Sequence, residues 1–301
     1  MNASTIRSQP AHHGESDGGA IAPPDSLRER SGQSSNAGAR AIPNETGWSA
    51  RRAVWRMTLI APVMAVGTAG VWSLTLLPLP SSLRVSAVNA LVTTCSRFLL
   101  RALNVRVQMV GRLPSAPMLL AGNHLSWIDI LAAKSLWPEA HFIAKEDVAR
   151  WPVVGRITRA AGTLYVDRAR RRDLLRSIPA LHESLRSGRS VLLFAEGTTT
   201  DGSETLAFKS SLFEGAIRAQ VPVLPVTFRA NTGAEGAPVS THVCWWGETS
   251  LLAHLPRVAG VRRIEFTVRI GEPITPGTCR KLLARRAHLA VQRAARHSDR
   301  S

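Results

Sequence analysis

A histidine and an aspartate five residues apart are the side chains in this chain of 301 residues that are best suited to acid–base chemistry. His124 and Asp129 follow Met118–Ala121, an apolar run that predicts a strand ended by Gly122. An imidazole at the carboxyl end of a strand is a natural general base near neutral pH, and a carboxylate on its other nitrogen stabilises the imidazolium. Five residues of ideal helix turn through about 500°, so the two groups can meet only if His124 lies in the turn and Asp129 in the first helical turn. A capping or core histidine and a first-turn acid favoured by the helix dipole are the alternatives.

A second polar turn follows the apolar run Val191–Ala195. Glu196, Gly197 and Thr198 form it, and the backbone N–H groups of a Gly–Thr turn can bind a phosphate or a developing oxyanion. The alternative is a plain turn at a strand end.

Nucleophilic and metal chemistry have little support in the sequence. No GxSxG nucleophile elbow occurs, and the three widely spaced cysteines provide neither a disulfide framework nor CxxC metal spacing. His242 and Cys244 are expected to alternate on a strand. We therefore expect no metal site and a base that activates a hydroxyl group of the substrate.

The pattern after Asn104 predicts the elements that position these groups. Short β-rich runs alternate with helical stretches, of which Arg170–Arg186 is the clearest because its leucines and isoleucine recur at helical spacing. This alternation predicts an α/β fold with a mostly buried mixed sheet flanked by helices. A basic amphipathic helix is expected at Cys279–Arg296, either packed on the fold or lying on a membrane surface. The predicted strands are 105–110, 118–121, 141–144, 191–195, 223–228 and 264–270.

An uncharged stretch from Met57 to Leu83 precedes this α/β region. Its apolar part, Met57–Leu79, is long enough for a membrane-spanning helix. Pro62 and two glycines cost stability in a soluble helix but are tolerated in a membrane, so a membrane-embedded helical segment is favoured over a buried core helix. Arginines flank both ends, so the segment could span the membrane or dip in and return. Val85–Leu103 fits an amphipathic helix, either interfacial or packed.

The charge balance points to an anionic partner. Lys and Arg number 38 against 21 Asp and Glu, which gives a net charge of +17. Phospholipid, nucleic acid or a phosphorylated substrate would fit this excess, but no helix-turn-helix, zinc-finger spacing or aromatic–basic platform is present, so nucleic acid is not expected. The polar, near-neutral start of the chain is expected to be disordered. The expected segments are a disordered tail (1–48), a membrane-anchoring helical segment (49–103), an α/β domain (104–275) and a basic C-terminal helix (276–301).

Four short motifs, taken together, resemble a known family. Asn123–Asp129 (NHLSWID) resembles the NHxxxxD block of the glycerolipid acyltransferases, the family of the 1-acyl-glycerol-3-phosphate acyltransferases. Gly162–Arg168 (GTLYVDR), Phe194–Thr200 (FAEGTTT) and Val221–Val226 (VPVLPV) resemble the family's next three blocks in the same order, and Lys145 stands where the family usually has a lysine. The resemblance covers roughly residues 80–275 and makes 104–275 the expected acyltransferase domain.

The resemblance implies a reaction and a role for each motif. An acyl chain would move from a thioester, acyl-CoA or acyl-carrier protein, to the free hydroxyl of a lysolipid at the membrane, with no cofactor and no metal. His124 would deprotonate the hydroxyl and Asp129 would orient His124. The expected acceptor-binding residues are Glu196, Gly197, Thr198, Arg168 and Lys209, and the expected supporting residues are Asn123, Lys145, Val223 and Pro225.

One departure from the family concerns the acceptor. The family usually continues its third block with an arginine that is thought to hold the acceptor phosphate, whereas this chain has Thr199. Threonine cannot reproduce the bidentate grip of a guanidinium, so Arg168 or Lys209 would have to replace it. Alternatively the acceptor carries no phosphate, because the EGTT and FKSS patterns also resemble acyltransferases of lyso-ornithine lipid.

The first expectation is therefore an enzyme of phospholipid biosynthesis that acylates 1-acyl-sn-glycerol-3-phosphate to phosphatidic acid. Acylation of lyso-ornithine lipid is the second, and a non-catalytic membrane-surface protein is the alternative of another class. The expected location is the cell inner membrane, on anionic phospholipid, with the catalytic domain on the cytoplasmic face.

Overall fold

A computed structural model describes residues 47–166 and 171–297. Nearly all of the expected tail, 1–48, and the expected acceptor residue Arg168 lie outside these described residues. The boundaries expected at 49, 104 and 276 stay predictions.

Seven strands in the described part of the chain form one sheet. They are β1 (Val105–Val110), β2 (Leu119–Gly122), β3 (His141–Lys145), β4 (Leu164–Val166), β5 (Val191–Phe194), β6 (Val223–Asn231) and β7 (Ile264–Ile270). Their order is β1-β7-β6-β2-β5-β3-β4. β2 is parallel to β5 and β6, and β3 is parallel to β4 and β5, whereas β7 is antiparallel to β6 and parallel to β1. The predicted mixed sheet is confirmed; β4, only three residues long, was not among the predicted runs.

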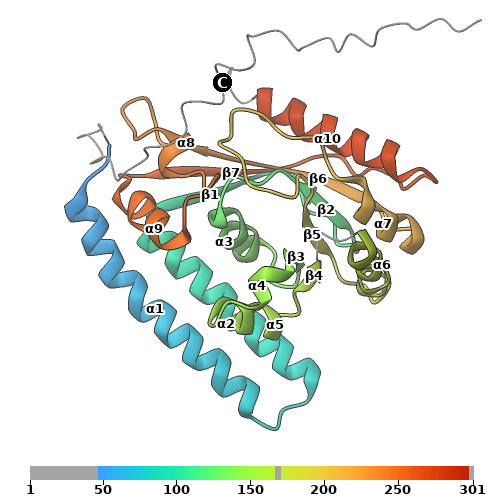
Figure 1. The fold of residues 1–301 in the computed structure, drawn as a ribbon, viewed down its shortest axis with the longest axis horizontal. Coiled ribbons are helices and arrows are strands. Elements are labelled where there is room, and N and C mark those ends of the chain that lie inside the picture. The colour runs from blue at the N-terminus through green and yellow to red at the C-terminus, as the bar shows by residue number, and fades with distance from the viewer. Residues whose placement is uncertain (1–46, 167–170, 298–301) are drawn as a thin grey trace, which may run out of the picture. The chain divides into compact units, whose positions relative to one another are not determined.

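Helices cover both faces of this sheet (Figure 1). They are α1 (Ala50–Leu76), α2 (Ser81–Ala102), α3 (Trp127–Leu136), α4 (Glu146–Ala149), α5 (Val154–Ala160), α6 (Arg171–Arg186), α7 (Phe213–Ala219), α8 (Val239–His242), α9 (Leu251–Gly260) and α10 (Arg280–His297), with a 3-10 turn at Ser210–Leu212. One apolar cluster joins α1, α2, α3 and α9 to the first face, and a second joins α6, α7 and α10 to the other. β2 and β5 are buried along their whole length, as expected of strands covered on both sides.

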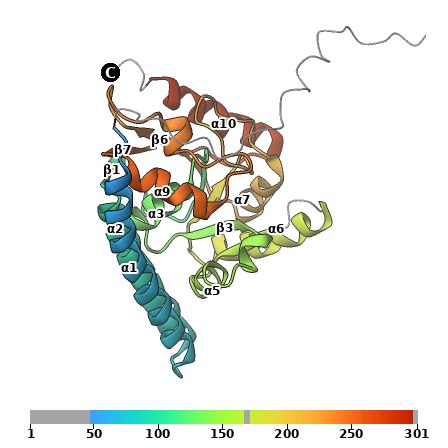
Figure 2. The same ribbon diagram turned by 60° about the vertical axis from the view of Figure 1, so that its left-hand side comes forward.

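The N-terminal apolar stretch forms a helical hairpin. α1 is long and apolar enough to cross a membrane, and most of its surface is exposed. The chain leaves it before Pro78 and Pro80 and returns as α2, and the tip of the pair extends beyond the neighbouring elements (Figure 2). Gly67 faces Cys95 so closely that an added Cβ would lie 2.8 Å from the Cys95 Sγ. At that position, glycine therefore serves close helix packing.

Arginines at the start of α1 attach the hairpin to the rest of the fold. Arg56 is buried, and its guanidinium donates hydrogen bonds to the carbonyls of Ala259 (3.1 Å), Val261 and Arg262 (3.0 Å), while Arg52 Nε donates to Gly260 (2.9 Å). These carbonyls lie at the C-terminus of α9, where the helix dipole favours a cation. The arginines at the start of α1, which the sequence suggested as the basic flank of a membrane segment, thus attach α1 to the C-terminus of α9.

Two expectations need correction or refinement. His242 ends the short helix α8 and Cys244 lies in the loop after it, so the predicted strand at this place is wrong. α10 packs on the sheet through buried Leu283 and Val291, which supports the packed alternative for the basic helix, but Leu282 points outward and is exposed.

Candidate active site

Several of the candidate residues predicted from the sequence lie at one edge of the sheet. Because β2, β3 and β5 run parallel, their carboxyl ends share an edge. His124 follows β2, Glu196 follows β5, and Lys145 is the last residue of β3. The register pairs Gly122 with Phe194, so the two polar turns leave the sheet side by side.

His124 and Asp129 are in direct contact. His124 lies in the turn before α3, and Asp129 lies in its first turn, the one arrangement in which the two could meet. The His124 Nδ1 and the Asp129 Oδ2 are 2.7 Å apart, and the side chains are 15% and 0% exposed. The same Oδ2 accepts the backbone N–H groups of Leu125 (2.6 Å) and Ser126 (3.0 Å). These two bonds hold the carboxylate in place, so the aspartate both caps the helix and orients the histidine.

The imidazole plane is held by an aromatic ring to which the sequence assigned no contact with the histidine. Phe194 stacks on His124 with the ring centroids 3.9 Å apart and the planes 14° from parallel. With the Nδ1–H directed at Asp129, the Nε2 carries the free lone pair, and it makes no hydrogen bond to any described residue. The ring is thus positioned to accept a proton at Nε2.

Asn123 ties the histidine turn to the neighbouring strand. Its Nδ2 donates to the Phe228 carbonyl (2.9 Å), and its Oδ1 accepts the Phe228 N–H (2.8 Å). The side chain is buried and joins the end of β2 to Phe228 within β6, as a backbone pair would. Asn123 therefore supports the position of His124 without facing a substrate.

A buried histidine missed by the sequence analysis braces α3 from the other side. The Trp127 Nε1–H donates to His254 Nδ1 (3.0 Å), and His254 Nε2 contacts the carbonyl of Cys244 (3.0 Å). Burial lowers the pKa of His254 to about 4, so the ring is neutral at pH 7. Neutral His254 accepts at Nδ1 and donates at Nε2. It thereby fixes the first turn of α3, which carries Asp129.

Glu196 is a carboxyl group kept neutral close to the pair. Its two oxygens are buried and accept no well-formed hydrogen bond from a described residue. Burial raises the pKa of Glu196 to about 8, nearby Asp129 adds to the rise, and backbone groups of His124 and Leu206 oppose it. The loop that follows is bonded to the histidine turn, since the Thr200 N–H donates to the His124 carbonyl (3.0 Å). The second polar turn therefore belongs to the same site.

The Gly–Thr turn is built around a lysine. Gly197 has a φ of +80°, which favours glycine, and an added Cβ would lie 2.8 Å from the Lys209 Nζ. The Lys209 N–H donates to the Ala195 carbonyl (2.8 Å), and Thr198 is exposed. The structure thus brings Lys209, Gly197 and Thr198 together beside Glu196.

Three other predicted residues lie farther from the histidine. Lys145 is exposed at the end of β3 and pairs with Asp147 (2.5 Å), which lowers the pKa of that aspartate. Val223 lies opposite Leu119, at the start of β2, and Pro225 opposite Ala121, so both belong to the sheet interior. Among the described residues, no group of three His, Cys, Asp or Glu side chains could hold a metal ion.

Comparisons with known proteins agree on one family. Residues 104–229 match the family described as Acyltransferase. A lyso-ornithine lipid O-acyltransferase from Brucella abortus is 38% identical over 202 residues, which cover 63% of this chain and 75% of the relative. A 1-acyl-sn-glycerol-3-phosphate acyltransferase from Neisseria meningitidis is 34% identical over 186 residues, 60% of this chain and 70% of the relative. The fold is similar to the crystal structure of the 1-acyl-sn-glycerophosphate acyltransferase PlsC from Thermotoga maritima, with a TM-score of 0.63. The two sequences are 18% identical, and the match covers 83% of this chain and 95% of PlsC.

Proposed function

The chain belongs to the lysolipid acyltransferase family, and on that premise we propose that it moves an acyl chain from a thioester donor to the free hydroxyl of a lysolipid. The donor would be acyl-CoA or acyl-carrier protein, and no cofactor or metal would take part. The observation that carries the proposal is the His124–Asp129 contact of 2.7 Å at the carboxyl edge of the sheet, with Nε2 free. A histidine oriented by a buried carboxylate is what proton removal from an alcohol requires.

The proposed reaction needs one proton relay. The Nε2 of His124 takes the hydroxyl proton while the lysolipid oxygen attacks the thioester carbonyl, and Asp129 stabilises the imidazolium that forms. As the new C–O bond forms and the C–S bond breaks, the imidazolium returns the proton to the leaving sulfur. General-base assistance of this kind contributes about 10²–10⁴ in rate, and alignment of two bound lipids supplies much of the rest.

The third motif favours a phosphate-free acceptor. Thr199 replaces the arginine that the sequence analysis associated with acceptor phosphate, and a hydroxyl cannot form the bidentate bond of a guanidinium. The relative from Brucella abortus is named for lyso-ornithine lipid. We therefore place lyso-ornithine lipid first. The phosphate acceptor 1-acyl-sn-glycerol-3-phosphate, expected first from the sequence, is the second candidate; Lys209, beside the Gly–Thr turn, is the cation that would serve it.

Membrane association forms part of the proposal. The α1–α2 hairpin exposes large apolar side chains such as Trp55, Leu76 and Leu83, and α1 is long enough to enter a bilayer. The proposed location is the inner membrane with the catalytic domain on the cytoplasmic face, where anionic lipid attracts a chain of net charge +17.

The test is acyl transfer by the purified full-length protein in neutral detergent. Lyso-ornithine lipid and 1-acyl-sn-glycerol-3-phosphate are offered side by side, with acyl-CoA and acyl-carrier protein as alternative donors. We expect one of the two acylated products with wild type and none above background with His124→Ala. Thr199→Arg should shift the ratio of kcat/KM values about tenfold toward the phosphate acceptor. Equal product from His124→Ala and wild type would refute the proposed mechanism.

A further inference from the structure

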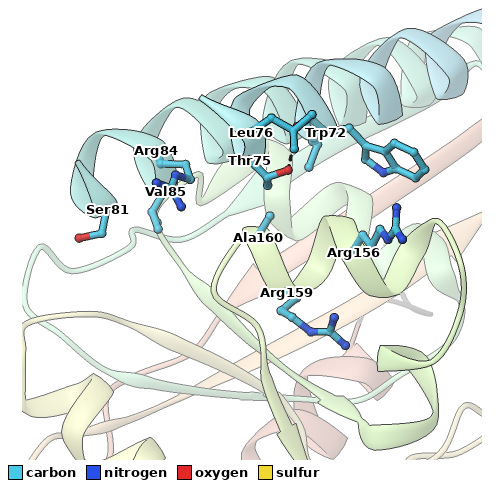
Figure 3. A pocket seen from close by; sticks show the side chains of 10 residues that line it. Trp72, Thr75, Leu76, Ser81, Arg84, Val85, Arg156, Arg159 and Ala160 are labelled. Atoms are coloured by element: carbon cyan, nitrogen blue, oxygen red, sulfur yellow. Dashed lines mark hydrogen bonds between the residues drawn. The ribbon is translucent and has the colours of Figure 1, made fainter. Parts of the chain in front are cut away.

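A cavity of about 450 Å³ lies between the hairpin and α5, away from the His124 turn. Its walls come from the last turns of α1, the first turns of α2 and the helix α5 (Figure 3). Its lining, in the part of the chain that the structure describes, includes no residue of the turns after β2 or β5. A cavity of this size fits a small ligand or part of a lipid, so it is a candidate site separate from the one described above.

The lining of the cavity combines apolar side chains with three arginines, Arg84, Arg156 and Arg159. Val71, Leu76, Val85 and Ala160 contribute to the walls. Figure 3 shows Arg84 toward one end and Arg156 beside Trp72 toward the other. Among the described residues, no Asp or Glu lines the cavity.

Arg156 is a cation with a free hydrogen-bonding edge. Its guanidinium carbon lies 4.4 Å from the centroid of the Trp72 ring, so the indole supports one face of the guanidinium. It forms no ion pair or hydrogen bond with a described residue, and its side chain is exposed. The N–H groups at the edge of a stacked guanidinium match the oxygens of a phosphate.

The other two arginines already have carbonyl partners. Arg84 donates to the Leu79 carbonyl (2.8 Å) at the hairpin turn, and its Nε is buried without an acceptor. Arg159 donates to the Ala149 carbonyl (3.2 Å). Neither has a carboxylate partner among the described residues, so both add positive potential around the cavity.

The surroundings favour a lipid over a soluble phosphate. Leu76, Leu77 and Leu83, near the turn of the hairpin, are 85%, 48% and 54% exposed, so the cavity lies beside an exposed apolar surface of the hairpin. The apolar walls of the cavity and the guanidinium of Arg156 together complement an amphipathic molecule that carries a negative charge.

We infer that this cavity binds one anionic glycerophospholipid, with an acyl chain along the apolar wall and its phosphate on the guanidinium of Arg156. The inference rests on the membrane association in the proposed function and adds a lipid site that is neither the acceptor nor the donor site. A bound lipid would join α5 to the hairpin and so couple the catalytic domain to the surface from which its substrate comes.

Native mass spectrometry of the full-length protein in neutral detergent tests the inference. The probes are phosphatidylglycerol and phosphatidylcholine at equal concentration, since both have phosphates but only the first carries net negative charge. We expect wild type to retain phosphatidylglycerol about tenfold better, because the arginines that line the cavity repel the choline cation of phosphatidylcholine. Arg156→Gln should lower retention of phosphatidylglycerol to the level of phosphatidylcholine, and Ala160→Trp, which fills the cavity, should lower retention of both.

The matched control is Arg285→Gln, which removes one exposed arginine from α10 on the other face of the sheet. It should retain lipid as wild type does. Retention of phosphatidylglycerol at the wild-type level by Arg156→Gln or Ala160→Trp, or an equal loss in Arg285→Gln, overturns the inference. Displacement of the lipid by millimolar inorganic phosphate would also overturn it, because the site would then recognise free phosphate. Acyl transfer is measured separately, so failure of the proposed function leaves this readout intact.

Discussion

Replacing Asp129 with asparagine removes one charge and almost no volume from the pair with His124. The Oδ2 of Asp129 accepts the N–H groups of Leu125 and Ser126 as well as the His124 Nδ1–H. An asparagine must turn its carbonyl oxygen to the same place, because its NH₂ group there would leave two buried N–H groups unsatisfied at about 1–3 kcal/mol each. The His124 tautomer is thus retained, and only the charge that stabilises the imidazolium is lost.

The magnitude follows from that geometry. A hydrogen bond to a charged group contributes about 1.5–3 kcal/mol, and each 1.36 kcal/mol corresponds to about a tenfold change in rate. A neutral carbonyl acceptor, which contributes about 0.5–1.5 kcal/mol, remains after the substitution, so the charge itself contributes the difference of about 1–1.5 kcal/mol. Asp129→Asn should therefore lower kcat about 5- to 13-fold with little change in melting temperature. His124→Ala removes the base and should cost about 10²–10⁴. Asp129→Ala should lower the free energy of unfolding by about 2–6 kcal/mol, because two backbone donors lose their acceptor.

Steady-state acyl transfer in detergent micelles and thermal unfolding by circular dichroism measure these effects. A kcat for Asp129→Asn within twofold of wild type would show that the charge contributes nothing. If folded Asp129→Asn loses as much kcat as His124→Ala does, the main contribution of the carboxylate is to orient the His124 imidazole and not to supply a negative charge.

Three further predictions concern the turns around the pair. The raised pKa of Glu196 means that, between pH 4.5 and about 8, the folded state holds a proton that the unfolded state releases. Because the lowered pKa of His254 acts in the opposite direction in the acidic part of this range, the effect of Glu196 is measured as a difference between wild type and Glu196→Gln. The free energy of unfolding of wild type relative to Glu196→Gln, measured in urea, should fall as the pH rises across that range, and a constant difference would contradict the prediction. Gly197→Ala forces a side chain onto a φ of +80° against Lys209 and should cost about 1–2 kcal/mol, so a melting temperature equal to wild type would argue against the strain. Asn123→Ala leaves the backbone groups of Phe228 unpaired and should destabilise by about 2–5 kcal/mol in denaturant melts, whereas a neutral result would mean that water replaces the side chain.

Motifs of consecutive residues could be interpreted directly from the sequence. His124 and Asp129 are separated by one turn, so strand, turn and helix start are enough to predict that they can meet, and the structure confirms the contact. The mostly buried mixed sheet flanked by helices was also predicted, because buried β-rich runs separated by helices have few other solutions. The roles of these residues in catalysis stay predictions.

Residues far apart in the sequence could not be placed in that way. Phe194 reaches the His124 ring only because β5 pairs with β2 in a register that no local pattern specifies. The same holds for His254, which braces α3 from a distance of 127 residues, and for Arg56, whose apparent membrane-flanking charge binds carbonyls of α9.

The sequence by itself determined the family, the layered α/β fold and the local geometry of the histidine turn, because short-range sterics and apolar periodicity depend on residues that are close together in the sequence. Only the tertiary structure decided how Glu196 becomes a neutral acid and how Arg156 comes to stack on Trp72 beside an apolar cavity. Burial and charge are properties of the whole packed chain, and no residue carries them alone.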